Sequence, residues 1–248
     1  MPCDCSDNQQ YGVLIIGLGK IGLQYDLTSL DNCFFTHTKA FHRHPGFDII
    51  GGIDPLPDRC NEFEEATSKP ARQSLENLTL TEKPAIIVIS TQPENRLEII
   101  QRCLALRPNL VLLEKPLALN VEEGSRILSL CREYRAELFV NYFRRCDPVV
   151  QQIKVDIQKN NFGAFLSGHV YYSGGVFTNA SHLLDLILFW FDTSNKVVAI
   201  GGTPWPSRAG DIDLDFWLDL KGGRCVFQAI DKRAFDMAQI EIVFENAV

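Results

Sequence analysis

Long apolar runs, a basic excess and internal repeats are all missing from this sequence of 248 residues. No apolar stretch approaches the roughly 18 residues that a membrane-spanning helix needs. The polar and acidic segment 1–10 lacks the charged-then-apolar pattern of a signal peptide. A formal net charge of −7, with no basic stripe, argues against a phosphate backbone as ligand. These absences predict a cytoplasmic protein that binds neither nucleic acid nor membranes.

Metal-ligand patterns are missing as well. The eight cysteines are scattered, and although Cys3 and Cys5 are close together, no second Cys/His pair has metal-ligand spacing. The apolar neighbours of Cys103, Cys131 and Cys225 indicate buried free thiols in a reducing compartment. No metal site is predicted.

What the sequence does contain is an alternation of apolar strands and amphipathic helices, in a chain with an ordinary globular composition of 46% hydrophobic and 22% charged residues. Strands are predicted at residues 13–16, 47–53, 85–90, 109–113 and 138–142. The intervening helices are predicted at residues 36–44, 56–67, 93–106 and 121–135. Such strand–helix repetition predicts an α/β fold, a doubly wound parallel sheet of the Rossmann type, over residues 1–143.

The pattern changes near residue 144. Helices are expected at residues 148–159 and 179–191, with a strand at 163–173 between them. The remaining strands are expected at residues 196–202, 212–220, 224–231 and 237–244, as a meander. Lys221-Gly222-Gly223 between two of these strands is typical of a hairpin. This order predicts an α+β domain with a mostly antiparallel open sheet over residues 144–248.

The motif GLGKIG at residues 17–22 follows the first strand directly, which is the context in which G-x-G-x-x-G is informative. Gly17 permits a tight turn, and Gly19 lets backbone amides approach a pyrophosphate. Gly22 allows close packing of a following helix, whose N-terminal dipole favours the anion. The motif predicts a dinucleotide-binding site.

Asp54 ends the second strand, where a carboxylate can accept hydrogen bonds from both adenosine ribose hydroxyls and so favours NAD. Asp54 could instead only start the turn with Pro55, and the nearby Arg59 keeps NADP open. Asp54 lies 32 positions after Gly22, where about 20 is usual. The excess is an aromatic-rich insertion at residues 24–35, either part of a lid or a plain surface loop.

Leu112-Leu113-Glu114-Lys115-Pro116 stands at the end of the strand 109–113. A lysine at the carboxyl end of such a strand lies where open α/β sheets bind their ligands. Pro116 forbids a helix at once and keeps Lys115 extended. Thr91-Gln92-Pro93 occupies another strand-to-helix turn at the same sheet edge. Lys115 is therefore predicted to face a nicotinamide ring.

His182 lies in the apolar helix 179–191, and Asp185 follows on nearly the same face. A histidine among leucines is commonly a satisfied core residue. The preceding segment 173–178 is a Gly-rich loop, however, and such loops let the backbone approach a ligand. His182 would then open onto the domain junction, a common ligand site.

Together these segments resemble the Gfo/Idh/MocA family of glucose–fructose oxidoreductase and inositol dehydrogenase relatives. The segments that carry the resemblance are GLGKIG (17–22), Asp54, STQP (90–93), LLEKPLA (112–118), NYFRRCDP (141–148) and NASHLLDLILFWF (179–191). The resemblance implies an NAD(P)-dependent oxidoreductase that transfers a hydride between nicotinamide and a secondary alcohol or ketone of a sugar, nucleotide sugar or polyol.

Individual roles follow from the motifs and the resemblance. Lys115 is similar to the family's active-site lysine, His182 matches its acid/base histidine, and Asp185 matches an acid that supports the histidine or the substrate. The expected cofactor-binding residues are Gly17, Gly19, Lys20, Ile21, Gly22, Asp54, Thr91, Pro93, Glu114, Lys115 and Asn141. The expected substrate-binding residues are Thr178, Asn179, Asp185, Arg145 and Tyr172.

Two departures from the family pattern stand out. Many members carry an aspartate four residues before the histidine, where this chain has Thr178, so a dinucleotide-binding sensor without turnover is the alternative. Relatives associated with surface-polysaccharide sugars look similar at this loop. The sequence also stops at Val248, earlier than is usual in the family, which suggests a compact or truncated second domain.

Two expectations concern partners. Leu214, Phe216, Leu218 and Leu220 alternate along one strand and predict an apolar sheet face; in the family such a face commonly pairs subunits, which implies a homo-oligomer. Arg144 and Arg145 could bind an anionic group of the substrate, or form an interdomain structural pair.

Overall fold

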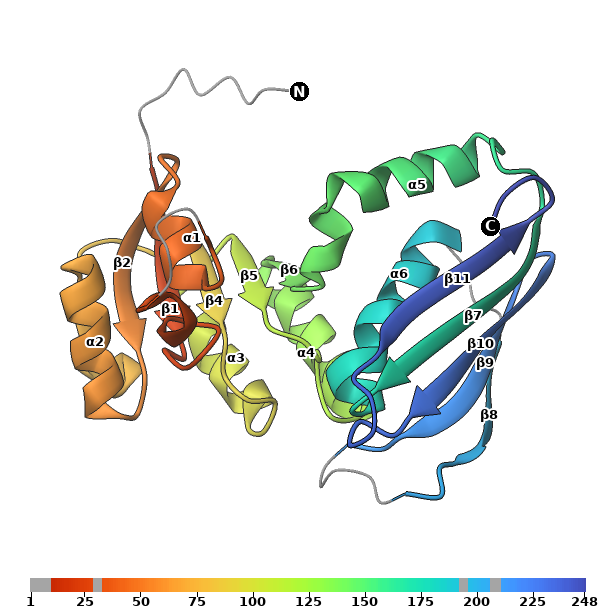
Figure 1. Cartoon of the computed structure of the whole chain (residues 1–248). Coiled ribbons are helices and arrows are strands. Elements are labelled where there is room, and N and C mark those ends of the chain that lie inside the picture. The colour runs from red at the N-terminus through yellow and green to blue at the C-terminus, as the bar shows by residue number, and fades with distance from the viewer. Residues whose placement is uncertain (1–9, 29–32, 192–195, 206–210) are drawn as a thin grey trace. The chain divides into compact units, whose positions relative to one another are not determined.

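The computed structural model describes residues 10–28, 33–191, 196–205 and 211–248, so Cys3 and Cys5 lie outside the described residues. The chain divides into a first unit, Met1–Asn141, and a second unit, Tyr142–Val248. Figure 1 labels their helices and strands.

The first unit is built on a six-stranded sheet with the strand order β3-β2-β1-β4-β5-β6, in which every described pairing is parallel. Its strands are β1 (Tyr11–Ile16), β2 (Phe47–Ile53), β3 (Ala71–Arg72), β4 (Ile86–Ile89), β5 (Leu110–Leu113) and β6 (Glu137–Val140). This is the strand order of a dinucleotide-binding Rossmann sheet. The predicted fold class is confirmed, although the two-residue strand β3 is too short to produce a periodicity signal.

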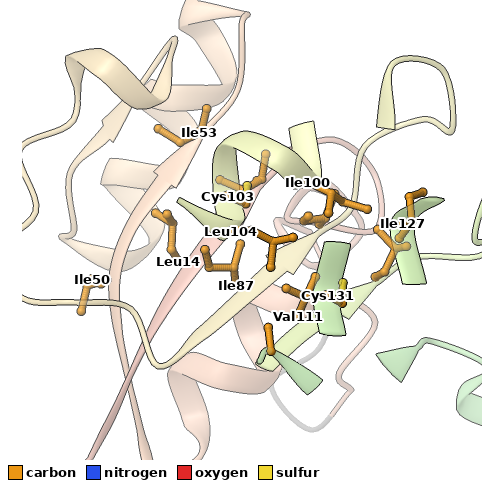
Figure 2. Close-up of a cluster of buried hydrophobic side chains, with 14 of the residues drawn as sticks. Leu14, Ile50, Ile53, Ile87, Ile100, Cys103, Leu104, Val111, Ile127 and Cys131 are labelled. Atoms are coloured by element: carbon orange, nitrogen blue, oxygen red, sulfur yellow. The ribbon is translucent and has the colours of Figure 1, made fainter. Parts of the chain in front are cut away.

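Helices cover both faces of this sheet, because successive side chains of a strand point to opposite faces. The helices are α1 (His37–Arg43), α2 (Pro57–Thr67), α3 (Arg96–Leu104) and α4 (Val121–Tyr134). Leu14 and Ile16 pack with residues of α3 and α4, whereas Val13 and Ile15 pack with residues of α2 and with Phe41 of α1. Figure 2 shows the first of these two clusters. Each fully buried isoleucine or leucine stabilises the fold by about 1.5–3 kcal/mol.

The second unit contains a five-stranded sheet with the order β11-β7-β10-β9-β8. Its strands are β7 (Phe165–Ser173), β8 (Lys196–Gly202), β9 (Leu214–Leu220), β10 (Gly223–Ile230) and β11 (Ala238–Phe244), and its helices are α5 (Pro148–Gln158) and α6 (Ser181–Phe191). The sheet is mostly antiparallel, as predicted. The expected meander ends at β10, however, because β7 lies between β10 and β11 and pairs with β10 in parallel.

The apolar face of β9 corrects one prediction. Phe216, Leu218 and Leu220 are buried in the core of the second unit together with Leu183 and Ile187 of α6. This face is covered by the chain's own helix, so it is not available to a partner subunit. The alternation identified a buried face correctly but could not say what covers it.

Other parts of the described chain bear on the remaining predictions. The six cysteines within the described residues are free thiols, and burial raises the pKa of Cys103 and of Cys225 to about 12. Among the described residues, no helix has both the length and the apolar character needed to cross a membrane.

Candidate functional site

The glycine motif forms a tight loop that follows β1 and packs against Ser90, the residue that directly follows β4. Gly17 has a φ of +90°, and a Cβ added to it would lie 2.9 Å from the carbonyl carbon of Ser90. The Ser90 hydroxyl donates a hydrogen bond of 2.6 Å to the carbonyl oxygen of Gly17. A Cβ on Gly22 would overlap that same oxygen. Only glycine therefore fits at residues 17 and 22, and the loop leaves its backbone close to whatever binds there.

The helical path that starts after Gly22 is interrupted by the insertion at residues 24–35, and the helix predicted at residues 36–44 follows it as α1 (His37–Arg43). The chain makes one helical turn, with the Leu23 amide bonded to the Gly19 carbonyl at 2.8 Å, continues through the 3₁₀ helix Gln24–Asp26 and then leaves the helical path. The helix resumes at α1, where the amide of His37 donates to Ile21 O at 3.1 Å. The amide of Thr38 likewise donates to Gly22 O at 3.0 Å. The insertion at residues 24–35 therefore interrupts a helix whose two parts remain joined by backbone hydrogen bonds.

Asp26 closes the two ends of this insertion. Its Oδ2 accepts hydrogen bonds from the Phe35 amide at 2.9 Å and from the amide and hydroxyl of Thr36, both at 2.7 Å. Lys39 Nζ lies 3.8 Å from Oδ1 of the same carboxylate. Three aromatic side chains of the insertion are more than half exposed: Tyr25 (53%), Phe34 (55%) and Phe35 (56%).

Asp54 is 2% exposed and holds the glycine loop rather than pointing into solvent. Its Oδ2 accepts hydrogen bonds from the Leu18 amide at 2.8 Å and from Arg59 Nη1 at 3.2 Å, and its Oδ1 accepts from the Leu56 amide at 3.0 Å. Arg59 is itself 34% exposed. Its Nη1 lies 3.5 Å from the place of a Cβ on Gly19, so a guanidinium group borders the second glycine.

Glu114 connects three segments at the carboxyl edge of the sheet. Its Oε1 accepts a hydrogen bond of 2.6 Å from the Asn141 amide group and lies 2.8 Å from His37 Nε2. Burial raises the pKa of Glu114, but the hydrogen bonds from His37 and Asn141, and the charges of His37 and Lys115, outweigh it and bring the pKa below its usual value. Sequence reasoning missed His37, because the helix at residues 36–44 was predicted but no pattern in it indicated a contact with Glu114.

Arg96 was also missed, and it is the largest fully buried side chain among the described residues. Its guanidinium donates to Glu114 O at 2.8 Å, to Pro116 O, and to Thr91 O at 2.6 Å. Burial lowers the pKa of this guanidinium and the Glu114 carboxylate opposes that effect; an arginine nonetheless stays protonated. Arg96 therefore fixes the backbone on both sides of Lys115, which is half-buried directly after β5.

The predicted cofactor-binding residues all follow the carboxyl ends of neighbouring strands. Asp54 follows β2, the glycine loop follows β1, Thr91 follows β4, Lys115 follows β5 and Asn141 follows β6. Lys20 is exposed, whereas Ile21 and Pro93 are half-buried. The hydroxyl oxygen of Thr91 is buried without a hydrogen-bond partner among the described residues. Parallel strands bring these groups to one edge, where such sheets bind ligands.

In the second unit, the helix that carries His182 begins earlier than predicted, with a π-helical turn at Val176–Ala180. Two carboxylates missed by sequence reasoning hold this turn. Asp211 accepts hydrogen bonds from the amides of Phe177 (2.8 Å) and Thr178 (2.7 Å), and Asp213 accepts from the Gly175 amide (2.9 Å). A Cβ on Gly175, which has a φ of +97°, would overlap Asp211. Single π-helical turns of this kind are frequent at functional sites.

His182 is half-buried and packs between two aromatic rings. The ring of Tyr142 lies edge-on with its centroid 5.8 Å away, and that of Phe143 lies 5.9 Å away. Burial raises the pKa of Tyr142 and the charge of Asp185 adds to this, while a hydrogen bond with Ser181 and the charge of Arg145 act against it. His182 therefore packs against both rings and keeps part of its surface exposed.

Asp185 is bonded to Arg145, through both carboxylate oxygens. Arg145 Nε donates to Oδ2 at 2.6 Å and Nη2 donates to Oδ1. The guanidinium also stacks over the ring of Phe189, 5.0 Å from its centroid. Arg145 therefore forms a structural pair inside the second unit, which differs from the interdomain pair considered as an alternative.

Two more predicted substrate residues support the fold of the Gly-rich loop and the core. Asn179 Nδ2 donates to the Ser173 carbonyl at 2.6 Å. Tyr172 is completely buried, and its hydroxyl donates to Leu214 O at 2.6 Å while accepting from Leu214 N at 2.9 Å. The prediction of a substrate contact for Tyr172 is not supported by this position, because the side chain is part of the core.

The family model GFO_IDH_MocA, described as "Oxidoreductase family, NAD-binding Rossmann fold", matches residues 11–142, just over half of the chain. The chain belongs to this family. No curated protein matches it significantly in sequence. The matched part of this Gfo/Idh/MocA member is an NAD-binding Rossmann domain. The glycine loop at residues 17–22 forms a cradle that a Cβ would fill, and the buried Thr91 hydroxyl has no partner among the described residues; both features fit a dinucleotide.

Several solved structures share the whole fold of this Gfo/Idh/MocA member. A putative NADPH-dependent oxidoreductase from Desulfitobacterium hafniense has a TM-score of 0.80 at 15% identity, covering 95% of this chain and 71% of that one. A putative myo-inositol dehydrogenase from Sinorhizobium meliloti has a TM-score of 0.77 at 18% identity, covering 96% and 74%. The WlbA dehydrogenase from Bordetella pertussis, crystallised with NADH and UDP-GlcNAcA, has a TM-score of 0.79 at 19% identity, covering 96% and 72%.

Proposed function

We propose that this protein is an NAD(P)-dependent dehydrogenase that transfers a hydride between nicotinamide and a secondary alcohol or ketone of a sugar, nucleotide sugar or polyol. The observation that carries the proposal is Lys115, placed at the carboxyl edge of the Rossmann sheet and flanked by two carbonyls that the buried Arg96 holds. Family membership and the dehydrogenases of similar fold support it. The UDP-GlcNAcA bound to WlbA, and the resemblance at Thr178, support a role in surface-glycan metabolism.

In this proposal NAD, when bound, supplies the hydride acceptor. His182 accepts the proton of the substrate hydroxyl, because a neutral imidazole ring has a nitrogen lone pair that can take up a proton. Lys115 provides fixed positive charge beside the developing alkoxide. The carboxylates of Asp211 and Asp213 hold the π-helical turn that directly precedes α6, and so fix the start of the helix that carries His182. The second unit binds the substrate.

The test uses two substitutions. Lys115→Ala and His182→Asn are each expected to lower turnover by about 10²–10⁴-fold, the range of a single acid/base or electrostatic group. NADH binding, measured by its fluorescence, should persist in both variants, because the glycine cradle is intact. Undiminished turnover in Lys115→Ala would remove the proposed role of the lysine.

A second candidate is a dinucleotide-binding sensor without turnover. It is favoured by the two hydrogen bonds that Asp185 makes with Arg145 and by the neutral Thr178, at the position where many family members carry an aspartate. NADH binding without sugar-dependent change in nicotinamide absorbance, across a broad panel of sugars and nucleotide sugars, would favour the sensor.

The proposal extends to location and assembly. The free thiols favour the reducing cytoplasm. A homo-oligomer would use the sheet face opposite to the core, where Tyr171 and Trp217 are half-buried. Light scattering during size-exclusion chromatography measures the assembly, and a charged substitution such as Tyr171→Glu should shift an oligomer toward the monomer.

A further inference from the structure

The second unit contains a polar cavity of about 310 Å³ that the roles proposed for Lys115 and His182 do not use. Its walls come from the short helix Phe143–Cys146, from the π-helical turn and α6, and from the segment that joins β10 to β11. Two cations, one amide and one carboxylate line it, and they are Arg144, Lys232, Asn179 and Asp236.

Positive charge exceeds negative charge at this cavity. Lys232 Nζ lies 3.5 Å from Asp236, whose Oδ1 also accepts a hydrogen bond of 2.8 Å from the Ser173 hydroxyl. A Cβ on Gly174 would lie 2.7 Å from Lys232 Cδ, so the lysine stem crosses the Gly-rich loop. Arg144 is exposed and lines the cavity, whereas its neighbour Arg145 is committed to Asp185. The two arginines therefore have different tasks.

The cavity also lies beside the proposed base. Asn179 and Leu183 line it from successive turns of one helical face. His182 is not among the lining residues, but it follows Asn179 by three residues, and residues three apart are neighbours on a helix surface. A molecule that is anchored in this cavity and extends past Asn179 would therefore meet His182.

We propose that this cavity binds an oxyanion, a phosphate or a carboxylate, of the substrate, and that the substrate is an anionic sugar rather than a neutral polyol. The guanidinium of Arg144 grips the oxyanion through two parallel N–H groups, and the ammonium of Lys232 adds a point charge. Calling the bound molecule a substrate rests on the proposed dehydrogenase function, whereas the anion site rests on the cavity and its charges.

The experiment is isothermal titration of the full chain, loaded with NADH, with three matched probes. D-glucuronate carries a carboxylate, D-glucose 1-phosphate carries a phosphate, and D-glucose is neutral. At least one anionic probe should bind about tenfold or more tightly than D-glucose, as one charge-assisted contact allows. The anion that binds tightly identifies the group, and its affinity should fall as salt is added.

Arg144→Gln and Lys232→Gln should each weaken binding of the anionic probe by about tenfold. Lys232→Arg keeps the charge and should keep most of the affinity, which separates loss of charge from loss of folding. The matched control is Arg224→Gln, the same change at an exposed arginine at the opposite end of β10 from Lys232, and it should bind like the native chain.

Equal binding of all three probes, or native affinity in both neutral variants, would overturn the anion site. Its failure differs from failure of the proposed function. Oxidation of neutral polyols without any preference for anions would keep the dehydrogenase and remove the site. Charge-dependent anion binding with no sugar-dependent NADH formation would keep the site and remove the dehydrogenase.

Discussion

Removing the guanidinium of Arg96 should disturb the first unit more than any other single polar substitution there. Arg96→Met keeps most of the side-chain volume but leaves the carbonyls of Thr91, Glu114 and Pro116 without their buried donor. Each unsatisfied buried group costs about 1–3 kcal/mol. Because water can reach some of these oxygens after the change, we expect a total loss of about 3–5 kcal/mol in the free energy of unfolding.

The assay combines two probes of urea-induced unfolding. All three tryptophans lie in the second unit, at positions 190, 205 and 217, so their fluorescence reports on that unit alone. Far-ultraviolet circular dichroism reports on both units. In Arg96→Met the dichroism transition should move to lower urea, with the tryptophan transition moving less. Coincident and unchanged transitions would refute the role assigned to Arg96.

A positioning role makes a further demand on kinetics. Arg96→Lys restores a buried cation but not the planar fork that reaches three carbonyls. This variant should recover part of the stability and retain the KM for NAD. Its kcat should stay about tenfold or more below the native value, because Lys115 is no longer held in register. Full recovery of kcat would show that Arg96 only stabilises the fold.

Three more predictions follow from the first unit. The pKa of Glu114 lies below its usual 4.5, so its contribution to stability is complete above that pH and is lost as the pH falls through the lowered value. Urea unfolding at several pH values should therefore show that Glu114→Gln loses less stability on acidification than the native chain does. Parallel curves of stability against pH would contradict this. Arg59→Ala should weaken NADP binding about tenfold more than NAD binding, because guanidinium pairs with a 2′-phosphate. Fluorescence titration with NADPH and NADH measures the two affinities. An equal loss of affinity for both cofactors would exclude a contact between Arg59 and the 2′-phosphate. Gly22→Ala should lower NADH affinity by about tenfold or more, whereas Gly202→Ala, whose added Cβ meets nothing within 4 Å, should leave it unchanged.

Much of the Rossmann unit was predictable because its strands are short apolar runs that end in chemically distinctive residues. Asp54, Thr91 and Lys115 each follow such a run, and parallel pairing brings them to one edge. A buried role for Arg96 was not predicted, because one charge on the apolar stripe of an amphipathic helix resembles a break in the hydrophobic periodicity. Its position four residues before the buried Ile100 was the available signal.

Other features depend on contacts that no local pattern encodes. The hydrogen bond from His37 to Ile21 continues a helix across the insertion, and no sequence pattern in either segment indicates that the two segments are joined. Asp211 holds Phe177 from 34 positions away. Period-two alternation assigned the faces of β9 correctly, but it does not specify neighbours in a sheet, so the parallel pairing of β7 with β10 was invisible.

The hydrogen bonds of Asp26 make the geometry of the glycine loop independent of the length of the insertion. Because Asp26 ties the entry of the insertion to Phe35 and Thr36 at its exit, the helix keeps its register whatever length of chain is enclosed. Doubling a flexible loop costs only about 0.6 kcal/mol in closure entropy. Evolution, or an engineer grafting a reporter domain, can therefore rewrite this segment while the nucleotide-binding scaffold beneath it stays the same.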